Sequence, residues 1–249
     1  MGYRELSFNL PPDYREGDLR EAIVRELGIG SFTWQIEHKG LDARKKSDIH
    51  WQVRASVLSD ELAGGEAPVP PALAVPTRAR HERAVVVGSG PAGFFAALVL
   101  QKTGFQTTLI ERGTEVDERA ERIRTFETTG RFDPVSNYAF GEGGAGTFSD
   151  GKLTSRSKHI SKEKRFIIES YIRAGAPEEI RYLAHPHLGS DNLKVIVANL
   201  RREFLDLGGR YLFETQLQDI RVDGGRVVEV VTSAGIIEAD LCIIAPGHS

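Results

Sequence analysis

Three glycines with a fixed spacing form the part of this sequence that points most directly to chemistry. Gly88, Gly90 and Gly93 stand in a GxGxxG pattern within AVVVGSGPAGFFAALVL. In this pattern the first glycine permits a tight turn, the second lets the backbone approach a pyrophosphate, and the third lets a helix pack against a strand. The spacing therefore predicts a phosphate-binding turn, made by Gly88, Ser89, Gly90, Pro91, Ala92 and Gly93.

The sequence around these glycines supplies the context that the motif needs. An apolar run predicts a buried strand at 84–87, followed by a helix at 91–102 and a second strand at 107–110. Glu111 ends that second strand, where a carboxylate accepts hydrogen bonds from ribose hydroxyls and repels a 2′-phosphate, so NADP is disfavoured. Arg112 is counted with it among the expected cofactor-binding residues. The competing interpretation is a glycine-rich turn that binds nothing.

A second glycine cluster lies at 140–151, with the sequence FGEGGAGTFSDG. Such a loop lets backbone amides approach a flat polar ring without Cβ clashes. The alternative is a flexible surface loop, because glycine clusters are common in loops. The only cysteine of the chain, Cys242, is far away in sequence, so a dithiol relay within the chain is excluded.

FAD and NAD share the pyrophosphate, so the first βαβ unit alone does not separate them. An NAD domain usually continues with alternating β and α units, whereas this chain enters the glycine loop and later a series of strands that ends in EADLCIIAPG. That order resembles the glutathione-reductase-type FAD fold, in which a similar late strand passes near the flavin nucleotide. On this resemblance Gly247 is a cofactor-binding residue, although Pro246 replaces the usual threonine.

Five segments extend the resemblance over nearly the whole chain: LDARKKSDI, GSGPAG, FGEGGAGTFSDGKLTSR, AHPHLGSDNL and IIAPGHS. Together they resemble a bacterial family of FAD-dependent dehydrogenases. The resemblance implies an oxidoreductase that passes hydride between a substrate and flavin N5, with NAD(P)H as a candidate electron donor. It also implies that one set of loop residues lies along the ribityl chain and isoalloxazine: Gly143, Gly144, Ala145, Gly146 and Thr147. Ser149 and Lys152 would then tune the flavin charge.

Two further groups of residues favour structural interpretations. His185 and His187 could ligate a metal or donate a proton, but no third ligand has suitable spacing, so we expect no metal site and favour a structural loop. Asp191 is expected to cap the helix that follows. The basic run at 44–46 carries only three charges with aspartates beside it, which favours a solvated hairpin tip over an RNA-binding patch.

The chain divides into three segments. Residues 1–62 predict a small α+β domain of βαββ order, with Asp18 as a helix N-cap, and residues 63–82 form a Pro/Gly linker. Residues 83–249 predict an α/β, Rossmann-like FAD/NAD(P)-binding domain with a β-meander. We expect a strand at 241–245, buried and parallel to the strand at 84–87, which would bring Gly247 close to the turn at 88–90.

Composition sets the remaining limits. A net charge of −3, with 40% hydrophobic and 27% charged residues, predicts a soluble globular protein and does not favour a nucleic-acid partner. No apolar run approaches the roughly 20 residues that span a bilayer, and the N-terminus has no secretory signal pattern. A single cysteine fits a reducing compartment, so we expect a cytoplasmic protein without a membrane partner.

Three classes of function stay open: an FAD-dependent oxidoreductase, an FAD- or NAD-binding module with a structural or partner-binding role, and an NAD-binding domain without flavin. The sequence names neither the catalytic residues nor the substrate, and it leaves the oligomeric state open. Members of the resembling family continue beyond the GHS motif. We therefore expect this chain to be the N-terminal portion of a longer flavoprotein and to bind FAD weakly by itself.

Overall fold

The computed structural model describes residues 1–153 and 157–247, so the last letters of the FGEGGAGTFSDGKLTSR and IIAPGHS segments lie outside the described residues. The chain forms two compact units. The first comprises residues 1–72, 153–165 and 178–186, and the second comprises residues 73–152, 166–177 and 187–249. The first boundary between the two units, at residues 72 and 73, lies within the expected linker at 63–82. Residues 153–165 and 178–186 also belong to the N-terminal unit. No helix in the described ranges is long and apolar enough to cross a membrane.

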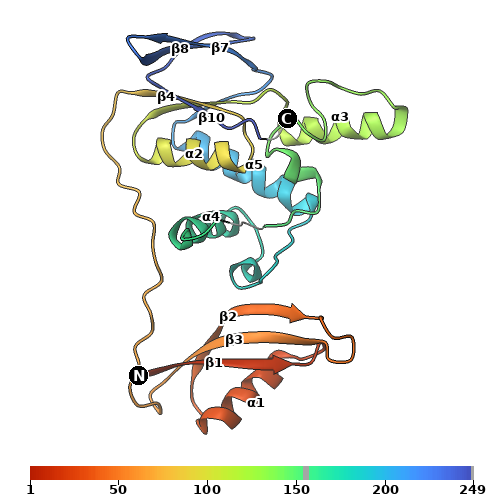
Figure 1. Cartoon of the computed structure of the whole chain (residues 1–249), viewed down its shortest axis with the longest axis vertical. Helices are drawn as coiled ribbons and strands as arrows, with labels where there is room; N and C mark the ends of the chain where they lie inside the picture. Colours follow the sequence, from red (N-terminus) through yellow and green to blue (C-terminus); the bar gives the residue numbers. More distant parts are fainter. Residues whose placement is uncertain (154–156, 248–249) are drawn as a thin grey trace. The chain divides into compact units, whose positions relative to one another are not determined.

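The first unit is built on a three-stranded antiparallel sheet with the order β1-β3-β2. Its elements are β1 (Gly2–Leu10), α1 (Glu16–Leu27), β2 (Thr33–Asp42) and β3 (His50–Ser59). Figure 1 shows α1 lying along one face of these strands. Alternate residues of each strand face this helix, and Leu19 and Ile23 of α1 are fully buried against Val53 and Val57 of β3.

The expected cap of α1 is wrong. Arg15 is the N-cap residue, and Asp18 lies three residues later, where its carboxylate accepts a hydrogen bond from the Arg15 N–H at 2.7 Å. The helix therefore begins earlier than its apolar pattern suggests, because an acidic residue in the first turn satisfies the N-cap amide from inside the helix.

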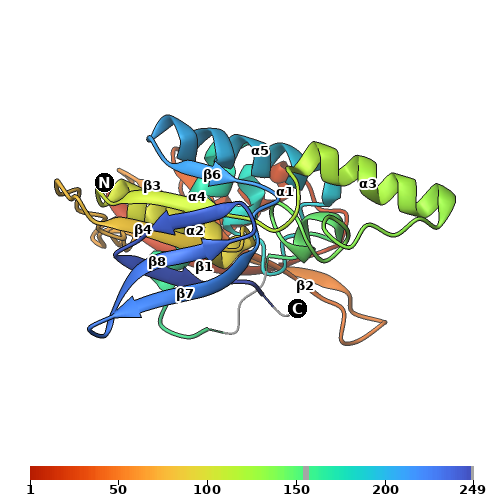
Figure 2. The same ribbon diagram turned by 90° about the horizontal axis from the view of Figure 1, so that it is seen from above.

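The second unit contains a four-stranded parallel sheet with the order β10-β4-β5-β6. The strands are β4 (Arg83–Val87), β5 (Gln106–Ile110), β6 (Arg210–Leu212) and β10 (Leu241–Ile244). Helix α2 (Pro91–Lys102) connects β4 to β5, which confirms the predicted strand–turn–helix–strand unit. This is a mixed α/β fold, and the carboxyl ends of β4 and β5 lie at one edge of the sheet (Figures 1 and 2).

A long excursion separates β5 from β6. It contains α3 (Val116–Thr129), the short 3-10 helices η1 (Ala145–Phe148) and η2 (Glu178–Arg181), α4 (Ser161–Arg173) and α5 (Ser190–Asp206). Gly189 is the N-cap of α5, so the prediction that Asp191 caps this helix is wrong. Asp191 instead lies in the first turn and forms an ion pair with Lys194.

The predicted β-meander is the antiparallel sheet β7-β8-β9, formed by β7 (Leu217–Asp223), β8 (Arg226–Thr232) and β9 (Gly235–Glu238). Gly224 and Gly225 form the turn between the first two strands with positive φ angles of 54° and 78°. Val230 of β8 packs with Val85 and Ile110 of the parallel sheet. Figure 1 shows the meander above the parallel sheet, with α2 and α5 below it.

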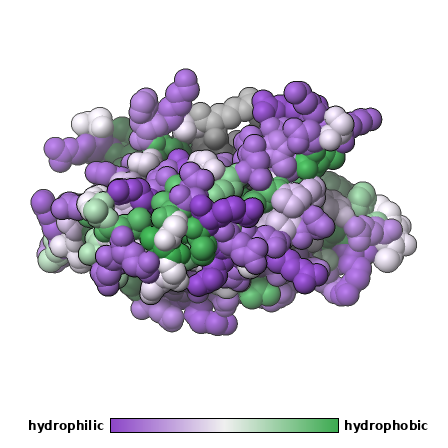
Figure 3. All heavy atoms as spheres, turned by 90° about the horizontal axis from the view of Figure 1, so that it is seen from below, coloured by the Kyte–Doolittle hydropathy of each residue, from purple (hydrophilic) through white to green (hydrophobic). Residues whose placement is uncertain are grey.

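Strand β10 pairs with β4 in parallel, as predicted, but the expectation that β10 is buried is wrong. It is an edge strand of its sheet, none of its residues is fully buried, and Ile244 is 59% exposed. A short apolar run does not distinguish a central strand from an edge strand. Hydrophilic side chains cover most of the one face drawn in Figure 3, with smaller hydrophobic patches between them.

Candidate functional site

The glycine turn lies between β4 and α2, and the space around its three glycines differs from one position to the next. Gly88 has a φ of +93°, and a Cβ there would lie 2.5 Å from the Ala245 carbonyl oxygen. A Cβ on Gly93 would lie 1.8 Å from the Gly88 carbonyl oxygen. A Cβ on Gly90 would meet nothing closer than the Gly144 Cα, at 3.9 Å. Packing thus excludes a side chain at Gly88 and at Gly93, whereas the protein leaves space beside Gly90.

Helix α2 presents its N-terminus at this open position. Gly90 is its N-cap and Pro91 its first residue, and no side chain caps the helix. The amides of the first turn, which include those of Ala92 and Gly93, have no partner inside an α-helix. Together with the helix dipole, they make the turn a favourable place for an anion.

Glu111 follows β5 and is buried beneath the turn. One of its carboxylate oxygens accepts hydrogen bonds from the Ser89 N–H (3.0 Å) and hydroxyl (2.7 Å). The other accepts from the amides of Gly113 (2.9 Å) and Gly141 (3.1 Å). An ionised carboxylate has about four acceptor positions, so the protein itself uses all of them. The sequence led us to expect ribose hydroxyls as its partners, whereas here it joins the turn to the loops at 113 and 141.

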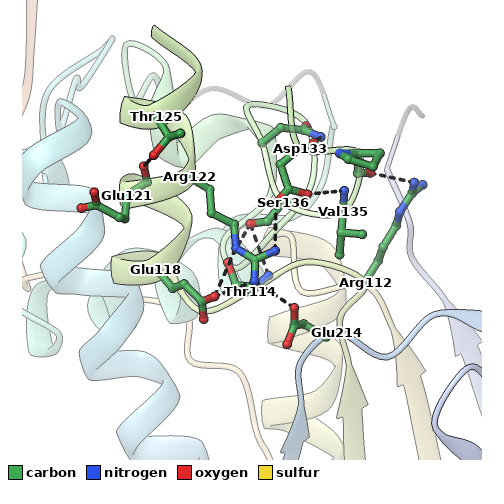
Figure 4. Close-up of polar contacts among 12 residues, drawn as sticks. Arg112, Thr114, Glu118, Glu121, Arg122, Thr125, Asp133, Val135, Ser136 and Glu214 are labelled. Carbon is green, nitrogen blue, oxygen red and sulfur yellow. Dashed lines mark hydrogen bonds and ion pairs between the residues drawn. The ribbon is translucent and has the colours of Figure 1, made fainter. Parts of the chain in front are cut away.

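Arg112 makes its contacts with residues other than Glu111. Its guanidinium stacks over the Phe140 ring, 4.0 Å from the centroid, and donates to the Pro134 carbonyl at 2.9 Å. Its Nε is buried and has no hydrogen-bond partner among the described residues. Figure 4 shows Arg112 near the loop that Arg122 anchors through Asp133, while Arg122 also pairs with Glu118 and Glu214.

The glycine loop lies directly on the glycine turn. The Gly143 N–H donates to the Ser89 carbonyl at 3.1 Å, and a Cβ on Gly144 would lie 3.0 Å from the Gly90 Cα. Ala145 begins η1, in which Thr147 is buried and Gly146 faces open space. The structure therefore brings together two glycine motifs that are far apart in the sequence, and both contact the backbone at Ser89 and Gly90.

The segment after β10 completes this edge of the sheet. Ala245 and Pro246 contact Gly88, as the close approaches of its Cβ position show. Gly247 follows with a φ of +79°, and its Cβ position has no neighbour within 4 Å. The contacts with the turn are therefore made by Ala245 and Pro246, whereas the expectation was for Gly247, whose place beside the turn stays a prediction.

The other residues singled out in the sequence lie further along the chain. The Ser149 hydroxyl donates to the Gly146 carbonyl at 3.0 Å, and Lys152 pairs with Asp150. Lys152 also forms an isolated antiparallel bridge with His187. This backbone pairing gives the His/Pro loop a structural role, and His185 belongs to the other compact unit.

Arg119 is the most notable residue that the sequence did not single out. Its side chain in α3 is fully buried and donates to the carbonyls of the glycine loop and of the turn before it. Burial lowers the pKa of its guanidinium to about 10, so it stays charged at neutral pH. An arginine within the charged stretch VDERAERIR predicts a surface position, and only the path of the loop around it shows otherwise.

Glu142 is the second buried ionisable group that the sequence did not reveal. One oxygen accepts hydrogen bonds from the Val116 N–H (2.8 Å) and from Arg201 (3.0 Å). The other oxygen has no partner among the residues that the structure describes. Burial raises the pKa of Glu142 to about 7, with Glu115 and Asp117 acting in the same direction and Arg201 opposing them.

This pKa predicts a pH-dependent stability. Because the folded-state pKa is raised from 4.5 to about 7, the folded protein binds more protons than the unfolded chain in that interval. The contribution of Glu142 to stability is therefore fully present below pH 4.5 and is lost as the pH rises through about 7. Glu142→Gln should remove this dependence and gain up to about 3 kcal/mol over wild type by pH 8. Urea unfolding at a series of pH values measures it, and parallel curves for the two proteins would contradict it.

Three comparisons with known proteins can be set beside this geometry. Residues 82–129 match the model of the FAD binding domain family. An uncharacterized protein of Clostridium beijerinckii is 35% identical over 264 aligned positions, which cover all of this chain and 49% of the relative. The chain thus spans about half the length of that curated relative.

Two solved structures show distant similarity to the chain. The THI4 protein of Thermovibrio ammonificans has a TM-score of 0.43 at 13% identity, covering 68% of this chain and 58% of its own. The ferredoxin reductase for the CYP199A2 system of Rhodopseudomonas palustris has a TM-score of 0.32 at 16% identity, covering 67% of this chain and 24% of its own.

The family match falls on β4, α2, β5 and α3, and so the segment that carries the glycine turn is an FAD-binding segment.

Proposed function

We propose that this chain supplies the FAD site of a flavin-dependent oxidoreductase. The observation that carries the proposal is the open position at Gly90, which lies between the N-terminus of α2 and the glycine loop. The fold itself would tolerate a Cβ at this position. We therefore infer that glycine is needed there to leave space for a ligand. The match of residues 82–129 to the FAD binding domain family supports FAD as that ligand.

The surrounding residues fit the pyrophosphate of a dinucleotide. The first-turn amides of α2 would donate to its oxygens, with the helix dipole favouring the negative charge. Gly143 and Gly144 would form the facing wall without side chains, and Gly247 would border the site from β10. Glu111 would hold the turn in shape and reach the adenosine ribose only by exchanging one of its present bonds.

Bound FAD would supply hydride exchange at flavin N5, for which the protein provides orientation and electrostatics. NAD(P)H is the candidate electron donor. The residues of this chain would bind and position the cofactor. The α2 amides would donate hydrogen bonds to its negatively charged phosphates, and the glycine loop, which has few side chains, would leave room for it beside the turn.

Anaerobic reduction tests the redox part of the proposal. The protein is mixed with FAD and then with NADH or NADPH, and the visible absorbance of oxidised flavin is followed. Loss of that absorbance faster than for free FAD under the same conditions is the expected result. Binding of FAD without any such acceleration, either by these donors or by photoreduction, would favour a binding module with a structural role and would overturn the oxidoreductase proposal.

A further inference from the structure

The hydrogen bonds of the Arg119 side chain among the described residues all go to backbone carbonyls. Its Nε donates to the Asn137 carbonyl at 2.9 Å, and its Nη2 donates to that of Tyr138 at 3.0 Å. Its Nη1 donates to the carbonyls of Gly141 (3.2 Å), Glu142 (2.7 Å) and Gly144 (2.9 Å). A guanidinium has five N–H donors in a rigid fork. All of its nitrogens are therefore committed to the backbone between residues 137 and 144.

The loop is shaped to admit this side chain. A Cβ on Gly141 would lie 2.4 Å from the Arg119 Cδ, and the guanidinium also lies over the Phe148 ring at 4.7 Å. Arg119 has no direct ion pair with a carboxylate among the described residues. Taking a charged group out of water is costly unless its donors are satisfied, so five carbonyl acceptors are what makes this burial tolerable.

Two of these bonds fix the part of the loop that touches the turn. The carbonyl and the N–H of a trans peptide point in opposite directions. In the Glu142–Gly143 peptide the carbonyl faces Arg119 and the N–H donates to the Ser89 carbonyl at 3.1 Å. The Gly144 carbonyl also faces Arg119, and the Gly144 Cα lies against Gly90. Arg119 thus holds the loop from behind while the opposite side of the loop contacts the turn.

We propose that Arg119 is a positioning residue of the dinucleotide site, which fixes the glycine loop against Ser89 and Gly90 and so sets the width of the space for the FAD pyrophosphate. This inference rests on the proposed function, because it assumes that FAD binds at the turn. Arg119 acts through the backbone of residues 141–144 and need not touch the cofactor. Its loss would let the loop move relative to α2.

The test compares Arg119→Lys and Arg119→Met with the control Arg122→Gln. Lysine keeps the charge but has a single nitrogen that cannot reach all five carbonyls. Arg122 lies one turn further along α3 and pairs with Glu118, Asp133 and Glu214 (Figure 4), so its loss tests destabilisation of the same helix without removing a bond to the backbone of residues 137–144. The Kd for FAD and the visible flavin spectrum are measured at a temperature at which circular dichroism shows every variant folded.

We expect Arg119→Met to weaken FAD binding by roughly 10-fold to 100-fold, the scale found when groups that support a site are removed. Arg119→Lys should recover part of that loss, and Arg122→Gln should keep the wild-type Kd even if its thermal midpoint falls. Wild-type Kd and flavin spectrum in both Arg119 variants would overturn the positioning role. Absence of FAD binding in the wild type would instead contradict the proposed function, so the two failures are distinguishable. If Arg119→Met does not fold, the Kd of Arg119→Lys decides alone.

Discussion

Replacing Gly90 by alanine is expected to leave the protein folded and to weaken FAD binding by about 100-fold, or about 3 kcal/mol. Gly90 has φ −65° and ψ 174°, an extended conformation that alanine adopts without strain. Its Cβ would lie 3.9 Å from the nearest neighbour, which is an ordinary contact. The new methyl group would therefore occupy only the space through which a pyrophosphate approaches the α2 amides.

The same substitution at Gly93 provides the contrast. There the Cβ would lie 1.8 Å from a backbone carbonyl oxygen, so α2 would have to move away from β4. We expect Gly93→Ala to lower the free energy of unfolding by roughly 2 kcal/mol or more, since overpacking against backbone is poorly relieved. Urea unfolding and FAD titration of both variants separate the two effects. An unchanged FAD affinity in folded Gly90→Ala would contradict the assignment of the site.

The second large effect is expected at Glu111. Glu111→Ala removes the acceptor of four hydrogen bonds and leaves the buried amides of Ser89, Gly113 and Gly141 without a partner. Buried donors that lose a charged acceptor cost more than an average hydrogen bond, so we expect the FAD-free protein to lose about 3–5 kcal/mol of stability. FAD affinity should also fall, because Ser89 and the loop at Gly141 lose their common anchor.

Two variants sharpen this prediction. Glu111→Gln keeps one acceptor oxygen, which can serve Gly113 and Gly141 but not also the Ser89 amide, and it should lie between wild type and Glu111→Ala. Glu118→Ala is the control: this exposed carboxylate pairs with Arg122 and should cost about 1 kcal/mol or less. If Glu111 acted through the ribose alone, FAD-free Glu111→Ala would unfold like wild type.

The dinucleotide-binding unit was predictable because local sequence determines it. Gly93 packs against Gly88 within the unit, and Gly88 packs against the segment that follows the neighbouring strand β10. Apolar runs in the sequence indicate β4 and β5 on either side of α2. The meander and the parallel pairing of β10 with β4 were also predictable, since short apolar strands and an Asp-Gly-Gly turn have clear patterns.

The supporting part of the site was not predictable for a physical reason. Arg119 and Glu142 are polar residues in polar stretches, and their burial depends on backbone that arrives from residues far along the chain. The helix starts at Arg15 and Gly189 were missed because the acidic residues Asp18 and Asp191 lie inside the first turn of their helices and were mistaken for caps. The hydrogen bond from Gly141 to Glu111 was missed for the same reason as the burial of Arg119 and Glu142, because Gly141 belongs to a loop 30 residues later.

A titration of FAD into the purified 249-residue protein tests the central claim most directly, with the visible flavin spectrum and flavin fluorescence as readouts. The account predicts saturable binding of one FAD per chain in the wild type, with a perturbed flavin spectrum, and binding that is about 100-fold weaker in folded Gly90→Ala. Absence of saturable FAD binding in the wild type, or equal binding by the two proteins, would contradict it.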